Sequence, residues 1–98
     1  MLKIDERFNL TKDKKDVGNI KVMIYNFEIR KEYDTAKMYI RDMDGSTIKI
    51  LEAIWLDKDG IYFHFDDTLE IGSYFFNISL NNEYESIDII YDRELKVC

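Results

Sequence analysis

Apolar and polar residues alternate along most of this chain, and that two-residue period restricts the fold more than any other feature. The alternation is clearest over residues 74–80 and recurs over residues 36–40. Successive side chains of a strand point to opposite faces of the sheet, so the pattern predicts strands with one buried face. By the same period, Ile87, Ile89 and Tyr91 are expected to share a face.

Turn signals separate these stretches at short intervals. The sequences D-M-D-G at 42–45 and D-K-D-G at 57–60 combine acidic residues with a Gly that tolerates positive φ. Residues 11–18 are polar and predict a loop. The spacing predicts about seven or eight short strands in an all-β fold, an immunoglobulin-like antiparallel β-sandwich that forms one domain over residues 1–98.

Residues 47–56 leave two readings open. Ile48 and Ile50 alternate with Thr47 and Lys49, which favours a strand. The stretch also contains good helix formers, so one or two helical turns are the alternative.

A short motif before the most regular strand also favours a sandwich. Leu69, Gly72 and Tyr74 form the pattern L-x-x-G-x-Y. In Greek-key sandwiches a Tyr at this position forms a hydrogen bond to the backbone a few residues upstream. Here Gly72 would permit the tight bend, and Leu69 would be buried beneath it. The alternative is that Gly72 only ends a turn and Tyr74 is an ordinary core residue. The Cys pair of antibody domains is absent, and Trp55 and Phe76 are the candidates for apolar packing in its place.

Composition and charge exclude several classes of partner. Hydrophobic residues make up 46% of the chain, which is enough for one core, and the net charge is −6. This charge opposes binding to a phosphate backbone, so we expect no nucleic acid. No apolar run is long enough to span a bilayer, so we expect no membrane. The single cysteine, Cys98, cannot form an internal disulfide, which is compatible with folding in a reducing cytoplasm.

Residues with catalytic or metal-binding potential are few. His64 is the single His and is expected to face away from the neighbouring Phe63 and Phe65. No Ser or Cys motif accompanies Asp66 and Asp67, so we expect no catalytic residues, no cofactor and no enzyme. The two acidic turns lack the register of a calcium loop and are interpreted as turns without a resident metal. The lysine-rich residues 12–15 are interpreted as a solvated loop.

Aromatic residues exceed what a core of this size can hold. Aromatics on sheet faces are typical of protein contact surfaces, although Tyr also tolerates strand surfaces through its β-propensity alone. The complete lack of Pro leaves edge strands without one common protection. We therefore expect a homo-oligomer or a part of a larger assembly. The interaction candidates are Tyr25, Phe27, Tyr39, Tyr62 and Phe75.

Residues 59–78, DGIYFHFDDTLEIGSYFFNI, carry a resemblance to a known family. An acidic-Gly turn, a D-G-x-Y strand, an acidic-Thr-Leu segment and G-x-Y-x-(aromatic) follow one another, and residues 8–13 read FNLTKD. The chain resembles the immunoglobulin-like domains of tailed-phage tail, baseplate and neck proteins, including the N-terminal domain of baseplate upper proteins. Asn77 stands where the family usually has Asp, and the segment before Gly72 is short.

The resemblance implies a virion component that is made in the bacterial host cytoplasm and contacts other phage or particle proteins. It carries no catalytic residues over to this chain. Two other functions remain open at this point. One is a small acidic phage or prophage effector that binds and inhibits a host protein. The other is a carbohydrate-binding module in which Trp55 and surface tyrosines form a platform.

Overall fold

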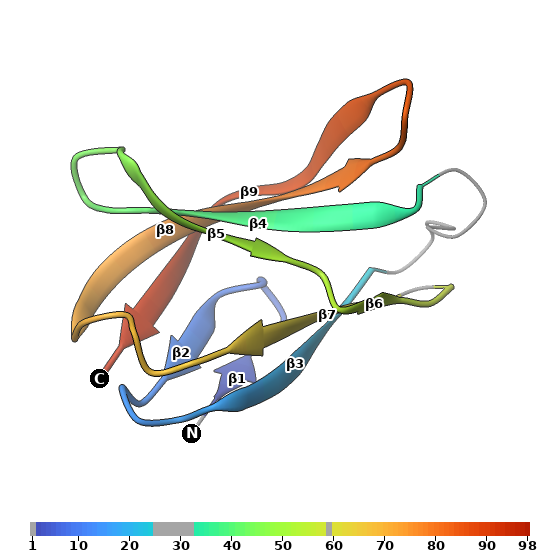
Figure 1. The fold of residues 1–98 in the computed structure, drawn as a ribbon. Helices are drawn as coiled ribbons and strands as arrows, with labels where there is room; N and C mark the ends of the chain where they lie inside the picture. Colours follow the sequence, from blue (N-terminus) through green and yellow to red (C-terminus); the bar gives the residue numbers. More distant parts are fainter. Residues whose placement is uncertain (1, 25–32, 59) are drawn as a thin grey trace.

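The computed structural model describes residues 2–24, 33–58 and 60–98, and the candidates Tyr25 and Phe27 lie outside this range. The described residues form two facing sheets without a helix (Figure 1). The strands are β1 (Lys3–Ile4), β2 (Leu10–Lys12), β3 (Gly18–Met23), β4 (Thr35–Arg41), β5 (Thr47–Glu52), β6 (Trp55–Leu56), β7 (Gly60–Phe65), β8 (Gly72–Asn81) and β9 (Ser86–Val97).

The larger sheet has the order β1-β2-β9-β8-β4-β5, and the smaller one has the order β3-β7-β6. The prediction of an all-β sandwich is confirmed, with nine strands in the described residues because two of them are only two residues long. All pairs are antiparallel except β2 with β9, which run parallel. This pair holds the end of the chain, since Cys98 N donates to Lys12 O and Lys14 N donates to Cys98 O, each at 2.8 Å.

The core lies between the two sheets and is built from the buried faces of the alternating strands. The most regular stretch behaves as predicted, because Phe76, Ile78 and Leu80 are fully buried. Trp55 does not join them. It pairs with Tyr62 on the outer face of the small sheet and is 54% exposed, so the prediction that it packs in the core is wrong. The other fully buried apolar residues include Val22, Ala36, Met38, Ile40, Ile61, Phe63 and Leu95.

The helical alternative for residues 47–56 is wrong. This stretch forms β5 and β6, which belong to different sheets. Along β5 the burial alternates, with Lys49 and Leu51 partly covered and their neighbours exposed. Pairing with β4 gives this stretch ladder hydrogen bonds within a packed sheet, whereas a helix of about ten residues is marginal in water without tertiary packing.

Lys12 is another correction, because it lies in β2 and not in a solvated loop. Its side chain is 0% exposed. The ammonium donates to the carbonyl oxygens of Asp13 at 2.8 Å and Lys14 at 3.0 Å. Burial of a charge requires such partners, and here the following turn supplies them.

The long strand β9 departs from strict alternation. Register shifts interrupt its pairing with β8 on both sides of Ile78, and Ile90 enters the core while Tyr91 is exposed. The expected common face of Ile87, Ile89 and Tyr91 is therefore wrong. A local irregularity follows at Asp92, where φ is +53° and the amide donates to Asn77 Oδ1 at 3.1 Å. Short-range periodicity cannot reveal such a bulge, because it adds one residue to one strand.

The corner before β8 has the predicted geometry. The Tyr74 hydroxyl donates to the carbonyl oxygen of Glu70 at 2.7 Å, and Leu69 is buried beneath the bend. From the β2–β3 turn, Lys14 Nζ donates to the carbonyl oxygens of Asp67 at 3.0 Å and Leu69 at 3.3 Å. The segment that connects β7 of the small sheet to β8 of the large sheet is thus held by hydrogen bonds from Tyr74 on one side and from Lys14 on the other.

We expect Tyr74→Phe to lower the free energy of unfolding by about 1 kcal/mol, because it removes the hydroxyl and keeps the ring. Urea denaturation followed by Trp55 fluorescence measures the change. Tyr84→Phe is the matched control, since Tyr84 is 86% exposed. Equal stability of the Tyr74→Phe variant and the wild type would show that the corner bond contributes nothing.

Candidate protein-contact surface

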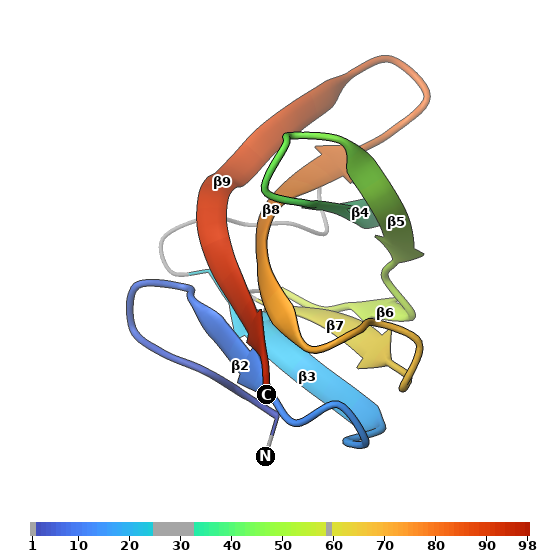
Figure 2. The same ribbon diagram turned by 90° about the vertical axis from the view of Figure 1, so that its left-hand side faces the viewer.

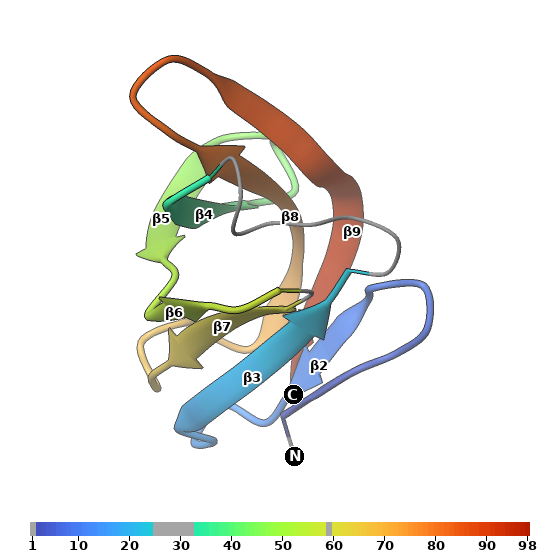
Figure 3. The same ribbon diagram turned by 90° about the vertical axis from the view of Figure 1, so that its right-hand side faces the viewer.

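One side of the sandwich has an open strand at the edge of each sheet. Among the described residues β5 pairs only with β4, and β6 pairs only with β7. Figures 2 and 3 show β5 descending along this side and continuing into β6, so that both edges belong to one margin. Open edges present backbone groups that can pair with another chain.

The same side carries half of the large exposed hydrophobic residues in the described ranges. We call the set the β5 margin: Met43, Ile48, Ile50, Ile54 and Trp55. Ile50 is 52% exposed although it lies in the middle of a strand. Single exposed hydrophobic residues are ordinary, but exposed isoleucines at two positions of one open strand indicate an interaction site.

The backbone of β5 offers hydrogen-bonding groups on the open side. Ala53 N donates to Ala36 O at 2.8 Å, and the register then pairs Leu51 with Met38 and Lys49 with Ile40. In an antiparallel ladder, residues that bond to the partner strand alternate with residues that do not. The N–H and C=O groups of 50 and 52 therefore point away from β4, and their side chains lie on the outer face. Ile48 is the extra residue at a register shift, and its side chain is 47% exposed.

Lys49 fixes which face of β5 is turned outward. Its Nζ lies 3.1 Å from Asp66 Oδ1 and 3.3 Å from Oδ2, and it also donates to Thr68 Oγ1. Thr68 donates to Asp66 Oδ1 through its hydroxyl at 2.6 Å and its backbone N–H at 3.0 Å. The bonds from Thr68, then Lys49, hold the pKa of the Asp66 carboxyl well below 3.8.

The predicted aromatic candidates are only partly brought together. Tyr39 pairs with Ile50 and so extends the apolar surface of the β5 margin onto β4. Phe75 is half-buried on the same sheet, beside Arg41 in the register. Tyr62 lies on the other sheet, where its hydroxyl donates to Asp57 at 3.2 Å and Lys21 Nζ lies 5.3 Å from its ring centre. Tyr62 therefore lies beside Trp55 on the outer face of the small sheet, and not beside Ile50.

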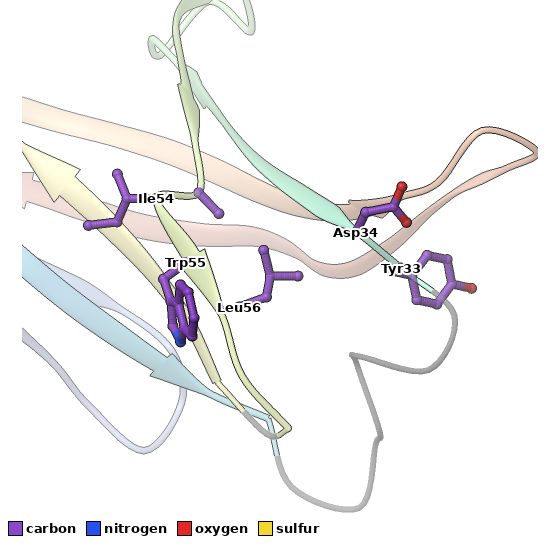
Figure 4. Close-up of a pocket in the computed structure, with 6 residues that line it drawn as sticks. Tyr33, Asp34, Ile54, Trp55 and Leu56 are labelled. Carbon is purple, nitrogen blue, oxygen red and sulfur yellow. The ribbon is translucent and has the colours of Figure 1, made fainter.

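A cavity of about 380 Å³ lies beside the margin, between the start of β4 and β6. In Figure 4 the Trp55 ring points down from β6, while the Asp34 carboxylate points up at the other end of the cavity. Tyr33 is buried and donates from its hydroxyl to Glu85 Oε1 at 3.1 Å. The indole ring of Trp55 and the carboxylate of Asp34 therefore do not point toward a common position in the cavity.

The acidic turns and the histidine have local partners. Asp42 Oδ1 accepts from the N–H groups of Asp44 at 2.9 Å and Ser46 at 3.0 Å, which is a conformational use of the carboxylate. His64 is exposed as expected, with Nδ1 2.8 Å from Asn19 Oδ1. Within residues 2–24, 33–58 and 60–98, no three His, Cys, Asp or Glu side chains are grouped to hold a metal ion.

In the part of the chain that the structure describes, no helix has the length and apolarity needed to span a membrane. Comparisons with protein-family models, with curated proteins and with solved structures found no match. The resemblance to phage-tail domains therefore stays a prediction.

Sequence reasoning missed the aliphatic members of the margin, because it looked for surplus aromatic residues. The signal was present in β5, where Ile48 and Ile50 alternate with Lys49 and Leu51. An ordinary edge strand would bury the two isoleucines and expose the lysine. The inverse arrangement requires Asp66 and Thr68, which come from a distant segment, and the local pattern does not reveal them.

We expect Asp66→Asn to destabilise the protein at neutral pH and to have less effect in acid. The folded-state pKa of Asp66 is depressed, so the stabilisation is present above the unfolded value of 3.8 and is lost as the pH falls below it. Urea midpoints of the wild type and the variant should differ less at about pH 3 than at about pH 7.

The matched control is Asp67→Asn, which removes the neighbouring exposed carboxylate. A constant difference between wild type and Asp66→Asn at both pH values would contradict the role of the ionised carboxylate.

Proposed function

We propose that this protein is a structural or adaptor component of a phage particle or a related contractile device, in the tail, baseplate or neck. It acts through contacts with other particle proteins, without a cofactor and without catalysis, and resides in the virion. The observation that carries the proposal is the β5 margin, where an open strand and exposed aliphatic side chains coincide. The resemblance of residues 59–78 to phage-tail domains supplies the biological setting.

The margin suits a repeated, permanent contact better than a transient one. Strand addition satisfies the outward backbone groups of 50 and 52 and gives affinity that does not depend on charge. The side chains of Ile48 and Ile50 would leave water in the same step. Because the chain carries a net charge of −6, its copies and acidic neighbours repel one another elsewhere, and this short-range contact must overcome that repulsion.

One observation favours the alternative of an acidic inhibitor of a host protein. The hairpin between β8 and β9 projects from the body of the sandwich (Figure 2). It and the following strand carry five exposed carboxylates, on Glu83, Glu85, Asp88, Asp92 and Glu94. Such a surface would dock on a basic partner, and salt would weaken the complex.

Another observation favours a carbohydrate-binding module. Trp55 and Tyr62 are register partners on the outer face of the small sheet, so their rings form the beginnings of a platform. Tyr39 belongs to the other sheet and does not extend it. Binding on a glycan array that is lost in Trp55→Ala would support this function.

We expect the double variant Ile48→Lys, Ile50→Lys to abolish larger complexes that the wild type forms with the proteins of its neighbouring genes. Lysines on an open edge oppose strand pairing, and both positions are exposed, so the fold should survive. Light scattering of the mixtures measures the complexes, and circular dichroism checks the fold. Tyr84→Lys, on the projecting hairpin, is the matched control.

The adaptor reading predicts that these complexes persist in high salt. Complexes that survive the double variant, dissolve in salt and are lost when Glu83, Glu85 and Asp88 are changed to Lys would contradict it. That pattern would establish the inhibitor instead.

A further inference from the structure

We propose that the β5 margin binds a second copy of this chain, through antiparallel pairing of the two β5 strands about a two-fold axis at Ile50. The inference rests on the proposed function only in taking the margin as a protein-contact surface. It goes further by naming the occupant and the register. Two-fold dimers place the same patch on both sides of the interface, so the patch must be complementary to itself.

The sequence of β5 meets that condition in one register. With the axis at Ile50, each Ile50 faces Ile50 of the second copy, Ile48 faces Glu52, and Lys49 faces Leu51. No like charges lie opposite each other, and such pairs would be destabilising. The residues with outward backbone groups are 50 and 52, so the two Ile50 residues form a hydrogen-bonded pair.

The neighbouring registers are worse. An axis at Lys49 would place the two lysines opposite each other. An axis at Leu51 would place Ile48 opposite Ile54, which lies beyond the end of β5, so part of the ladder would be lost. The register at Ile50 pairs Ile48 through Glu52 with one another and leaves only Thr47 opposite a residue outside β5.

The outer face gains a continuous apolar row in the same register. Tyr39 lies beside Ile50 on β4. Across the axis the order becomes Tyr39, Ile50, then Ile50 and Tyr39 of the second copy. Cross-strand pairs of aromatic and β-branched residues are among the stabilising contacts of sheets.

A head-to-tail arrangement is the main competing geometry. Strand β2 covers only residues Leu95 to Val97 of β9, so among the described residues the earlier part of β9 is a second open edge of the large sheet. That edge carries the register shifts around Ile78 and the positive φ of Asp92. Bulges twist an edge away from flat pairing. Strand β5 has one such irregularity, at Ile48, and pairs without interruption over Lys49–Glu52, the part that holds the proposed axis.

Disulfide trapping tests the register. Ile50→Cys and Ile48→Cys are each made in the Cys98→Ser background, because Cys98 is an exposed free thiol. In the proposed dimer the Cα atoms at the two 50 positions lie about 5.5 Å apart, within disulfide range. The two 48 positions are separated by four residues along the strands, roughly 13 Å, and cannot be bridged.

We expect oxidation to link the Ile50→Cys variant into covalent dimers and to leave the Ile48→Cys variant monomeric on a denaturing gel. Absence of linked dimers from Ile50→Cys, or equal linkage of both variants, would overturn the register.

Charge substitutions provide a readout that does not depend on oxidation. Ile50→Lys places two ammonium groups at the axis, and we expect the dimer dissociation constant in sedimentation to rise by more than about tenfold. Ile48→Lys places a cation opposite Glu52 of the second copy, so we expect the dimer to persist and to weaken in high salt. Loss of the dimer in Ile48→Lys together with its survival in Ile50→Lys would overturn the proposal.

Different results would overturn the dimer and the adaptor role. A wild-type chain that stays monomeric at high concentration overturns the dimer. The adaptor role fails separately, if mixed complexes with neighbouring proteins do not depend on the β5 margin.

Discussion

The inward position of Lys49 is the constraint on which the contact surface depends. Side chains alternate along a strand, so a shift of one residue would move Lys49 to the surface and bury Ile48 and Ile50. That alternative matches the usual preference of an edge strand. It is disfavoured here because Asp66 and Thr68 bind the lysine ammonium between the sheets, while Leu51 packs against the core from the same face. The exposed isoleucines are thus a consequence of an ion pair on the other side of the same strand.

Lysines serve a similar internal purpose at the other end of the sandwich. Lys12 is buried and binds two carbonyl oxygens of the following turn, and Lys14 binds two carbonyl oxygens of the segment before the tyrosine corner. Several cationic groups are therefore directed toward backbone and carboxylate oxygens within the fold. Because they are engaged there, the outer surface is more acidic than the composition alone suggests, above all along the β8–β9 hairpin.

The period of two was enough to predict the sandwich, the strands at 36–40 and 74–80, and the strand character of residues 47–52. The bond from Tyr74 to Glu70 was also predictable, because its motif is local and its geometry is fixed by a short bend. What was missed depends on contacts between distant segments. The burial of Lys12, the exposure of Trp55 and the bulge near Ile90 follow from pairing partners far along the chain. The contact surface was missed for the same reason, since only the Asp66 contact reveals which face of β5 is outward.

Charge and apolar surface act over different distances in this molecule. The carboxylates of the β8–β9 hairpin act over about a Debye length, roughly 8 Å at physiological salt, and so influence which molecules approach. The β5 margin acts only on contact, through backbone groups and aliphatic side chains, and so determines which molecules stay. The two features lie on different elements, and within β5 the single cation is already neutralised by Asp66. An interface that brings two β5 strands together must therefore gain enough from backbone pairing and aliphatic burial to offset the repulsion between two acidic copies.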